Sequence, residues 1–75
     1  MKIEGIQAFL TIVQTKSISK AAEKLFLSQP TVTNRLKALE SELKTTLIMR
    51  QKGSRNIEIT YQGELFMPIA EQWMS

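Results

Sequence analysis

The order of residues 17–30 constrains the fold of this chain more than any other stretch of its 75 residues. Ser17 can cap a short helix that runs to about Leu25, because its hydroxyl can accept from the free N–H groups of a first helical turn. Ser28 can cap another helix, with Pro30 in the first turn, where a missing N–H is tolerated. About three or four residues separate the two segments, which is the length of a helix-turn-helix connection.

The turn between these two segments lacks the glycine that such turns usually carry. Phe26 and Leu27 occupy it instead. We therefore expect either that both residues avoid positive φ or that one of them is held in a strained backbone conformation.

Periodicity predicts the elements on either side of this pair. Apolar residues recur at helical spacing over residues 3–15, and Thr60 is expected to cap a last helix that runs through the chain's end. Between them, residues 45–48 favour extended structure and residues 56–59 alternate with period two. Two short strands around the polar, basic residues 51–55 predict a β-hairpin that packs on the helices.

These elements predict a mainly α fold, a winged helix-turn-helix with a three-helix core and a two-stranded β wing, followed by a C-terminal linker helix. We assign residues 1–59 to the winged domain and 60–75 to the linker helix, the start of a dimerisation helix. A chain of this length has room for one small core. No C-terminal cap precedes Ser75, so we expect a fragment that ends within or just after a connecting helix.

Composition narrows the function. The chain has no Cys, His or Asp, which excludes disulfides, thiolate metal sites and Cys or His catalysis. No nucleophile–base pair stands out among the remaining residue types, so we expect neither an enzyme nor a bound cofactor. No stretch approaches the roughly 20 apolar residues of a membrane span, and Glu4 interrupts the apolar part that a signal peptide would need. We expect a cytoplasmic protein without a membrane partner.

Positive charge is concentrated in the middle of the chain. Residues 16–55 hold nine Lys/Arg against three Glu, a balance of +6, whereas the two ends hold one Lys against four Glu. A basic middle between acidic ends is typical of a surface that binds a polyanion. A solvated, lysine-rich surface is the alternative that charge alone leaves open.

The helix that begins after Ser28 has two distinct faces. At about 100° per residue, its apolar residues form one face, and short or amide side chains without an acid lie opposite, at its start. Asn and Gln can pair with adenine, while Thr and Pro can touch a thymine methyl, and such docking places the first residues of the second helix on the bases. The predicted base contacts are Gln29, Pro30, Thr31, Thr33 and Asn34. The alternative is the first turn of an ordinary surface helix.

Residues around this helix are expected to hold the DNA backbone. Phosphate is favoured near Ser28 by the positive end of the helix, and Arg35, near the edge of the apolar face, would reach a phosphate or a Glu rather than a base. Arg55 could enter a minor groove, where narrow A·T tracts attract arginine. The full set is Ser17, Ser28, Arg35, Lys37, Arg50, Lys52 and Arg55. A basic turn that merely keeps the chain in solution is the alternative for the hairpin.

One face of the last helix is apolar. Its residues are Leu65, Phe66, Ile69 and Trp73. This is more apolar surface than a chain of this size covers easily with one packed helix, so we expect a partner there. A two-fold homodimer would present two recognition helices to two half-sites. Packing of this face back on its own domain is the alternative.

Taken together, these residues resemble the N-terminal domain of LysR-type transcriptional regulators over nearly the whole chain. The resemblance rests on Phe9, residues 17–25, residues 28–33, Leu36, residues 39–43, Leu47, Arg50, Ile59, Thr60 and Gly63. Two departures stand out: Asn34 occupies a position where the family commonly has arginine, and Lys44 replaces a usual glycine.

The resemblance implies a longer bacterial cytoplasmic regulator, with a small-molecule effector domain outside this chain. It implies dimerisation through the last helix, tetramers of the full protein, and an interrupted inverted-repeat operator, often A·T-rich. The family's groove-contacting positions correspond to residues 29–31, Thr33 and Asn34, with a basic wing residue at Lys52 or Arg55.

We therefore expect sequence-specific binding of double-stranded DNA and regulation of transcription, with the helix of residues 28–43 in the major groove and the basic wing on the backbone or minor groove. The alternative is a winged-helix protein-interaction or dimerisation module that does not bind DNA. Such a module would tolerate Glu or large apolar residues on the groove face, where this chain has neither.

Overall fold

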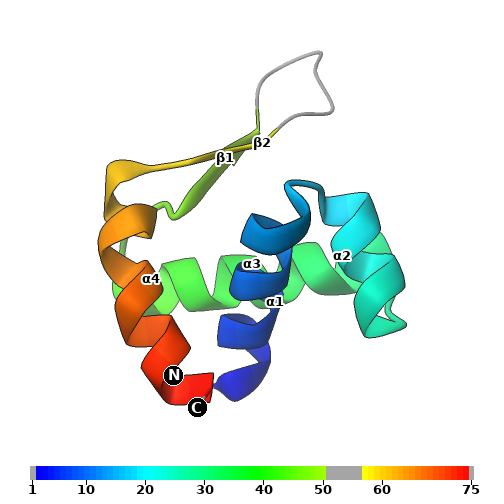
Figure 1. Ribbon diagram of the computed structural model, residues 1–75, viewed down its shortest axis with the longest axis horizontal. Helices are drawn as coiled ribbons and strands as arrows, with labels where there is room; N and C mark the ends of the chain where they lie inside the picture. The colour runs from blue at the N-terminus through cyan, green and yellow to red at the C-terminus, as the bar shows by residue number, and fades with distance from the viewer. Residues whose placement is uncertain (1, 51–56, 75) are drawn as a thin grey trace.

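The computed structural model describes residues 2–50 and 57–74 of the chain. Along these ranges it contains four helices and two strands, labelled in Figure 1. In chain order the elements are α1 (Ile3–Thr15), α2 (Ile18–Leu25), α3 (Gln29–Leu43), β1 (Ile48–Arg50), β2 (Ile57–Ile59) and α4 (Tyr61–Met74). The mainly helical, winged helix-turn-helix architecture is confirmed, and the helix bounds lie close to those expected.

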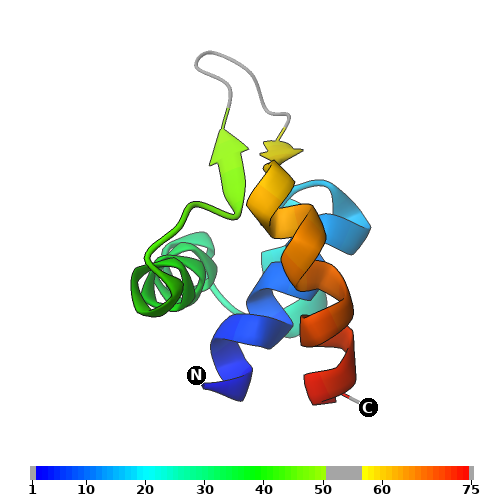
Figure 2. The same cartoon turned by 90° about the vertical axis from the view of Figure 1, so that its left-hand side faces the viewer.

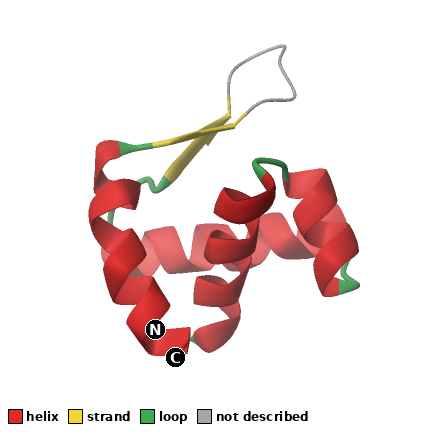
Figure 3. Ribbon diagram, in the orientation of Figure 1, coloured by secondary structure: helices red, strands yellow, loops and turns green. Residues whose placement is uncertain are grey.

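Helix α1 is the centre of the molecule and contacts α2, α3 and α4. The β-hairpin lies at one end of the helical body, and both chain ends lie at the opposite end (Figures 1 and 2). Figure 3 shows how far helix predominates over strand in the described residues. This arrangement separates the hairpin from the C-terminal half of α4.

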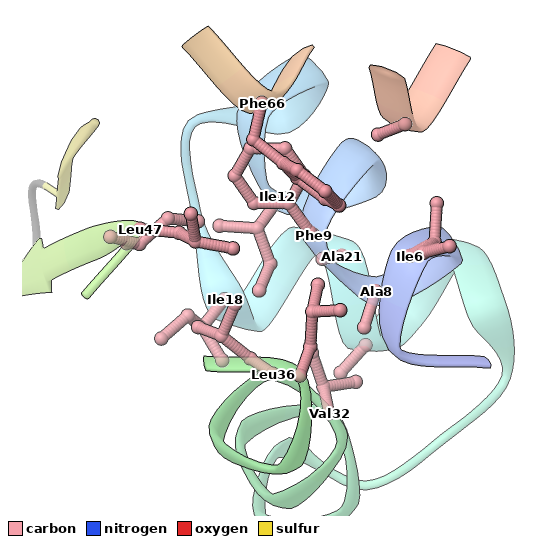
Figure 4. Packing of buried hydrophobic residues seen from close by; sticks show 14 residues of the cluster. Ile6, Ala8, Phe9, Ile12, Ile18, Ala21, Val32, Leu36, Leu47 and Phe66 are labelled. Carbon is pink, nitrogen blue, oxygen red and sulfur yellow. The ribbon is translucent and has the colours of Figure 1, made fainter. Parts of the chain in front are cut away.

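The core is built around the aromatic ring of Phe9. The large, fully buried side chains are Phe9, Ile6, Ile12, Leu39, Leu47 and Val32. Phe9 meets Phe66 of α4, with ring centroids 5.7 Å apart and planes inclined by 60° (Figure 4). Aromatic pairs favour such tilted arrangements over face-to-face stacking. The inner face of α4 therefore belongs to the same core as α1.

The burial of Phe66 corrects its predicted place on the apolar face that would meet a partner. Phe66 is only 7% exposed and shares the inner face of α4 with Gly63 and Ala70. Spacings of three and four residues place these three side chains on one stripe of the helix. Leu65 and Ile69, by contrast, are about half exposed, at 57% and 49%. Both faces of α4 carry large apolar residues, so the helical period alone could not separate them.

Three helices end in a left-handed residue that is not glycine. Lys16, Phe26 and Lys44 have φ of 56°, 58° and 55°. After α3, Thr45 N–H donates to Glu40 C=O and Lys44 N–H donates to Ser41 C=O, which satisfies the last carbonyls of the helix. Phe26 thus takes the strained option in the helix-turn-helix connection, and Lys44 ends α3 in the left-handed conformation that glycine favours.

The first strand of the hairpin begins later than the sequence predicts. Strands β1 and β2 are antiparallel and pair Ile48 with Ile59, and Arg50 with Ile57. Residues 45–47, expected in the first strand, form a connection, and the N–H of Leu47 at its end donates to the Glu40 side chain. Within the described ranges, no helix is both long and apolar enough to cross a membrane.

Candidate nucleic-acid interface

The start of α3 is fixed by Ser28. Its Oγ accepts from the Thr31 N–H at 3.3 Å and lies 2.8 Å from Thr31 Oγ1. Pro30 sits in the first helical turn, as expected, where its missing N–H leaves no carbonyl unsatisfied. The cap holds the first turn of the helix in place, and the Thr31 hydroxyl is engaged within the protein.

The five predicted base-contacting residues share the outward side of α3. Gln29, Pro30 and Asn34 are exposed, and Thr31 and Thr33 are half-buried. The opposite side of the helix packs into the core through Val32, Leu36 and Leu39. No acid occurs in the first turn of the helix. We call this surface, made by residues 29–31, Thr33 and Asn34, the reading face.

Helix α2 also begins with a serine cap. Ser17 Oγ accepts from the Lys20 N–H at 3.1 Å, which confirms the predicted cap. The Thr15 hydroxyl donates to Ser17 C=O at 2.8 Å and so ties the end of α1 to the start of α2. The N-termini of α2 and α3 therefore each carry a serine cap, and the positive end of a helix suits phosphate oxygens.

Arg35 and Lys37 lie in different surroundings on α3. Arg35 is half-buried and lines a groove of about 280 Å³ between the start of α1 and α3, together with Lys2, Glu4 and Glu42. Lys37 is exposed. The expected contact of Arg35 with a phosphate or a Glu stays a prediction.

Arg50 is the predicted wing residue that the structure describes. It is exposed at the end of β1, on the hairpin that projects beyond the helices (Figure 1). Lys52 and Arg55, the other two predicted wing contacts, lie outside the described residues.

Glu40 is a polar contact that sequence reasoning missed. Its Oε2 accepts from the N–H of Leu47 at 2.7 Å and from the N–H of Ile48 at 3.2 Å. The partners are backbone groups seven and eight residues further along, so neither side-chain type nor helical period reveals them. The signal available in the sequence was a glutamate near the end of a helix, directly before a predicted strand.

The outer face of α4 remains uncovered in the described chain. Tyr61 and Leu65 are 71% and 57% exposed, and Ile69 and Trp73 are each 49% exposed. Exposed apolar residues lined up along one helix are typical of a protein–protein contact.

The sequence profile described as "bacterial regulatory helix-turn-helix protein, lysR family" matches residues 3–64. The chain belongs to the LysR family. This membership confirms the resemblance noted in the sequence, and the matched residues include all of α3. Regulators of this kind are not enzymes, which agrees with the composition.

A curated LysR-family relative is the HTH-type transcriptional regulator BsdA of Bacillus subtilis (strain 168). It is 38% identical over 72 residues, which cover 96% of this chain and 24% of the relative. The chain therefore spans about a quarter of the length of that regulator.

Solved structures of LysR regulators share the fold. The CbnR DBD–DNA complex has a TM-score of 0.91 and 30% identity, covering 99% of this chain and 83% of the other. The BenM DBD with catB site 1 DNA has a TM-score of 0.86 and 31% identity, covering 99% of this chain and 81% of the other. Both of these relatives were solved bound to DNA.

Proposed function

We propose that this chain binds double-stranded DNA sequence-specifically and is the DNA-binding module of a bacterial transcriptional regulator. The observation that carries the proposal is the reading face: small and amide side chains, without an acid, on the outward side of the first turns of α3. Side chains of this kind approach base edges closely and can donate to or accept from them. The DNA complexes of CbnR and BenM support the same use of the fold.

In this proposal the contacts divide into two classes. Gln29, Pro30, Thr33 and Asn34 meet base edges in the major groove, and the methyl group of Thr31 adds an apolar contact. The cationic and hydroxyl groups around them contact phosphates and fix the register of the helix on the duplex. These are Ser17, Ser28, Arg35, Lys37 and Arg50, and we assign Lys52 and Arg55 to the same class or to the minor groove.

We further propose that two copies pair through the outer face of α4. Leu65, Ile69 and Trp73 form its centre, and their exposure in the single chain supports a second copy as the occupant. A two-fold pair would present two reading faces to an interrupted inverted repeat, with A·T-rich flanks under the wings. Tetramers and a small-molecule effector would involve parts of a longer regulator that acts in the cytoplasm.

Selection of bound duplexes from a random DNA pool tests this function. We expect enrichment of a short sequence in two inverted copies, with affinity that falls steeply with salt, at a slope of about −0.9 per phosphate contact. Thr33→Glu should abolish enrichment by placing a negative charge on the reading face. Gln62→Glu, which adds the same charge on the exposed side of α4, should leave enrichment intact. A pool without enrichment from a folded chain would contradict the proposal and favour a protein-interaction module.

A further inference from the structure

We propose that Glu40 is a positioning residue for DNA binding, because it sets the direction in which the wing leaves the recognition helix α3. The inference rests on the proposed function above. It concerns a cluster that we call the Leu47 junction, made by Glu40, Leu47, Thr60 and Gly63. None of these residues lies on the reading face, and their contribution would be indirect.

On one side, the junction joins the wing to α3. The Glu40 carboxylate accepts from two successive backbone N–H groups, those of Leu47 at 2.7 Å and Ile48 at 3.2 Å. Hydrogen bonds to a charged acceptor are roughly twice as strong as neutral ones. The backbone C=O of Glu40 also accepts from the Thr45 N–H at 3.1 Å. One residue of α3 thus holds both the end of its own helix and the first residue of β1.

On the other side, the junction joins the wing to α4. Leu47 C=O accepts from the Thr60 N–H at 2.9 Å, and the Thr60 hydroxyl donates to Thr46 C=O at 2.6 Å. That same hydroxyl accepts from the Gly63 N–H at 2.9 Å, which caps α4. A Cβ on Gly63 would lie 2.4 Å from the Leu47 oxygen, so only glycine permits this approach. The Leu47 side chain is fully buried.

The wing depends on this junction for its direction. In the part of the wing that the structure describes, each strand has three residues, and an isolated two-stranded hairpin is marginal in water. The backbone of Leu47, by contrast, is held on both sides. Its N–H donates to the Glu40 carboxylate, and its C=O accepts from the Thr60 N–H. Loosening the Glu40 side would leave the reading face unchanged but would release Arg50 from a fixed position relative to α3.

A double-mutant cycle on the selected duplex separates positioning from general stability. Glu40→Gln keeps the shape of the side chain and removes its charge; Arg50→Ala removes the wing cation. We expect each substitution to lower the affinity for the duplex about five- to tenfold. The double variant should lose no more affinity than the single variant with the larger loss, since both substitutions remove the same wing contact. Glu40→Gln combined with Asn34→Ala should instead multiply the two losses. Glu64→Gln, the same change at an exposed site on α4, should leave affinity unchanged.

Amide hydrogen exchange of the free protein provides an arm that needs no DNA. Exchange at Leu47 and Ile48 should accelerate in Glu40→Gln and more so in Glu40→Ala, while exchange within α1 stays slow. Unchanged exchange at these two amides would overturn the positioning role. A second result would also overturn it: faster exchange at these amides, together with affinity losses of Glu40→Gln and Arg50→Ala that multiply in the double variant. Glu40 would then act on stability alone. If the unmodified chain enriches no duplex, the proposed function fails, and the DNA role of Glu40 fails with it.

Discussion

At the scale of single residues, a bulky residue with left-handed backbone faces solvent rather than the core. Phe26 has φ of 58° in the helix-turn-helix connection and is 94% exposed. A bulky side chain in left-handed conformation is unfavourable by roughly 1–2 kcal/mol, and an exposed ring regains little of this by burial. The turn geometry, set by the capped helices on either side, therefore prevails over the preference of the residue.

Replacing Phe26 with asparagine should stabilise the chain. Asn tolerates left-handed backbone, so we expect the free energy of unfolding to rise by about 1 kcal/mol, measured by urea denaturation. Phe26→Ala retains a Cβ in the same conformation and should change stability far less. If Phe26→Asn destabilised the fold, the exposed ring would have a packing role that its surroundings do not suggest.

Lys37 should contribute to DNA affinity without contributing to sequence preference. Lys37 is exposed beside the reading face, and its charge would contact a phosphate, so Lys37→Ala should weaken binding to all sequences alike and reduce the salt slope by about 0.9. Titrations of selected and scrambled duplexes at several salt concentrations measure both effects. A loss confined to the selected duplex would instead place Lys37 on a base.

At the scale of elements, local signals in the sequence predicted the helices and missed the contacts between elements. Serine caps and apolar periodicity located α2 and α3 because both signals lie within the element itself. The start of β1 and the role of Glu40 depended on a hydrogen bond between a helix and a connection, which no local pattern encodes. Phe66 was misplaced because α4 is apolar on both faces, and only packing against Phe9 distinguishes them.

The two faces of α4 should respond to substitution in opposite ways. Ile69→Glu on the outer face should leave the chain folded but convert a dimer into a monomer, as measured by sedimentation. Phe66→Ala on the inner face should lower the free energy of unfolding by about 3–5 kcal/mol, because it leaves a cavity beside Phe9. A dimer that survives Ile69→Glu would contradict pairing through this face.

The close contact between Gly63 of α4 and the backbone of Leu47 leads to another prediction. Gly63→Ala should destabilise the fold by about 1–3 kcal/mol, because its Cβ would overlap the Leu47 oxygen. Gln62→Ala, at the exposed neighbouring position, should change stability by less than about 0.5 kcal/mol. Thermal or urea unfolding followed by circular dichroism compares the two. A neutral Gly63→Ala would mean that the connection can move away from α4.

At the scale of the whole molecule, a single core supports surfaces with different tasks. Helix α1 holds α3 on one side and α4 on another, so the reading face and the proposed dimer face are positioned by the same buried side chains. The Leu47 junction adds the hairpin to this frame through the Glu40 carboxylate and through the backbone hydrogen bond from Thr60 to Leu47. Two copies paired through α4 would thus hold two recognition helices at a fixed separation.

Repeating the DNA selection with Asn34→Ala tests whether the start of α3 reads bases. We predict that the variant recovers the same inverted repeat with relaxed preference at one base position in each half-site. The affinity lost on the original sequence should be on the order of 1–3 kcal/mol per base contact. Recovery of an unchanged sequence at unchanged affinity, by both Asn34→Ala and Thr33→Ala, would contradict the claim.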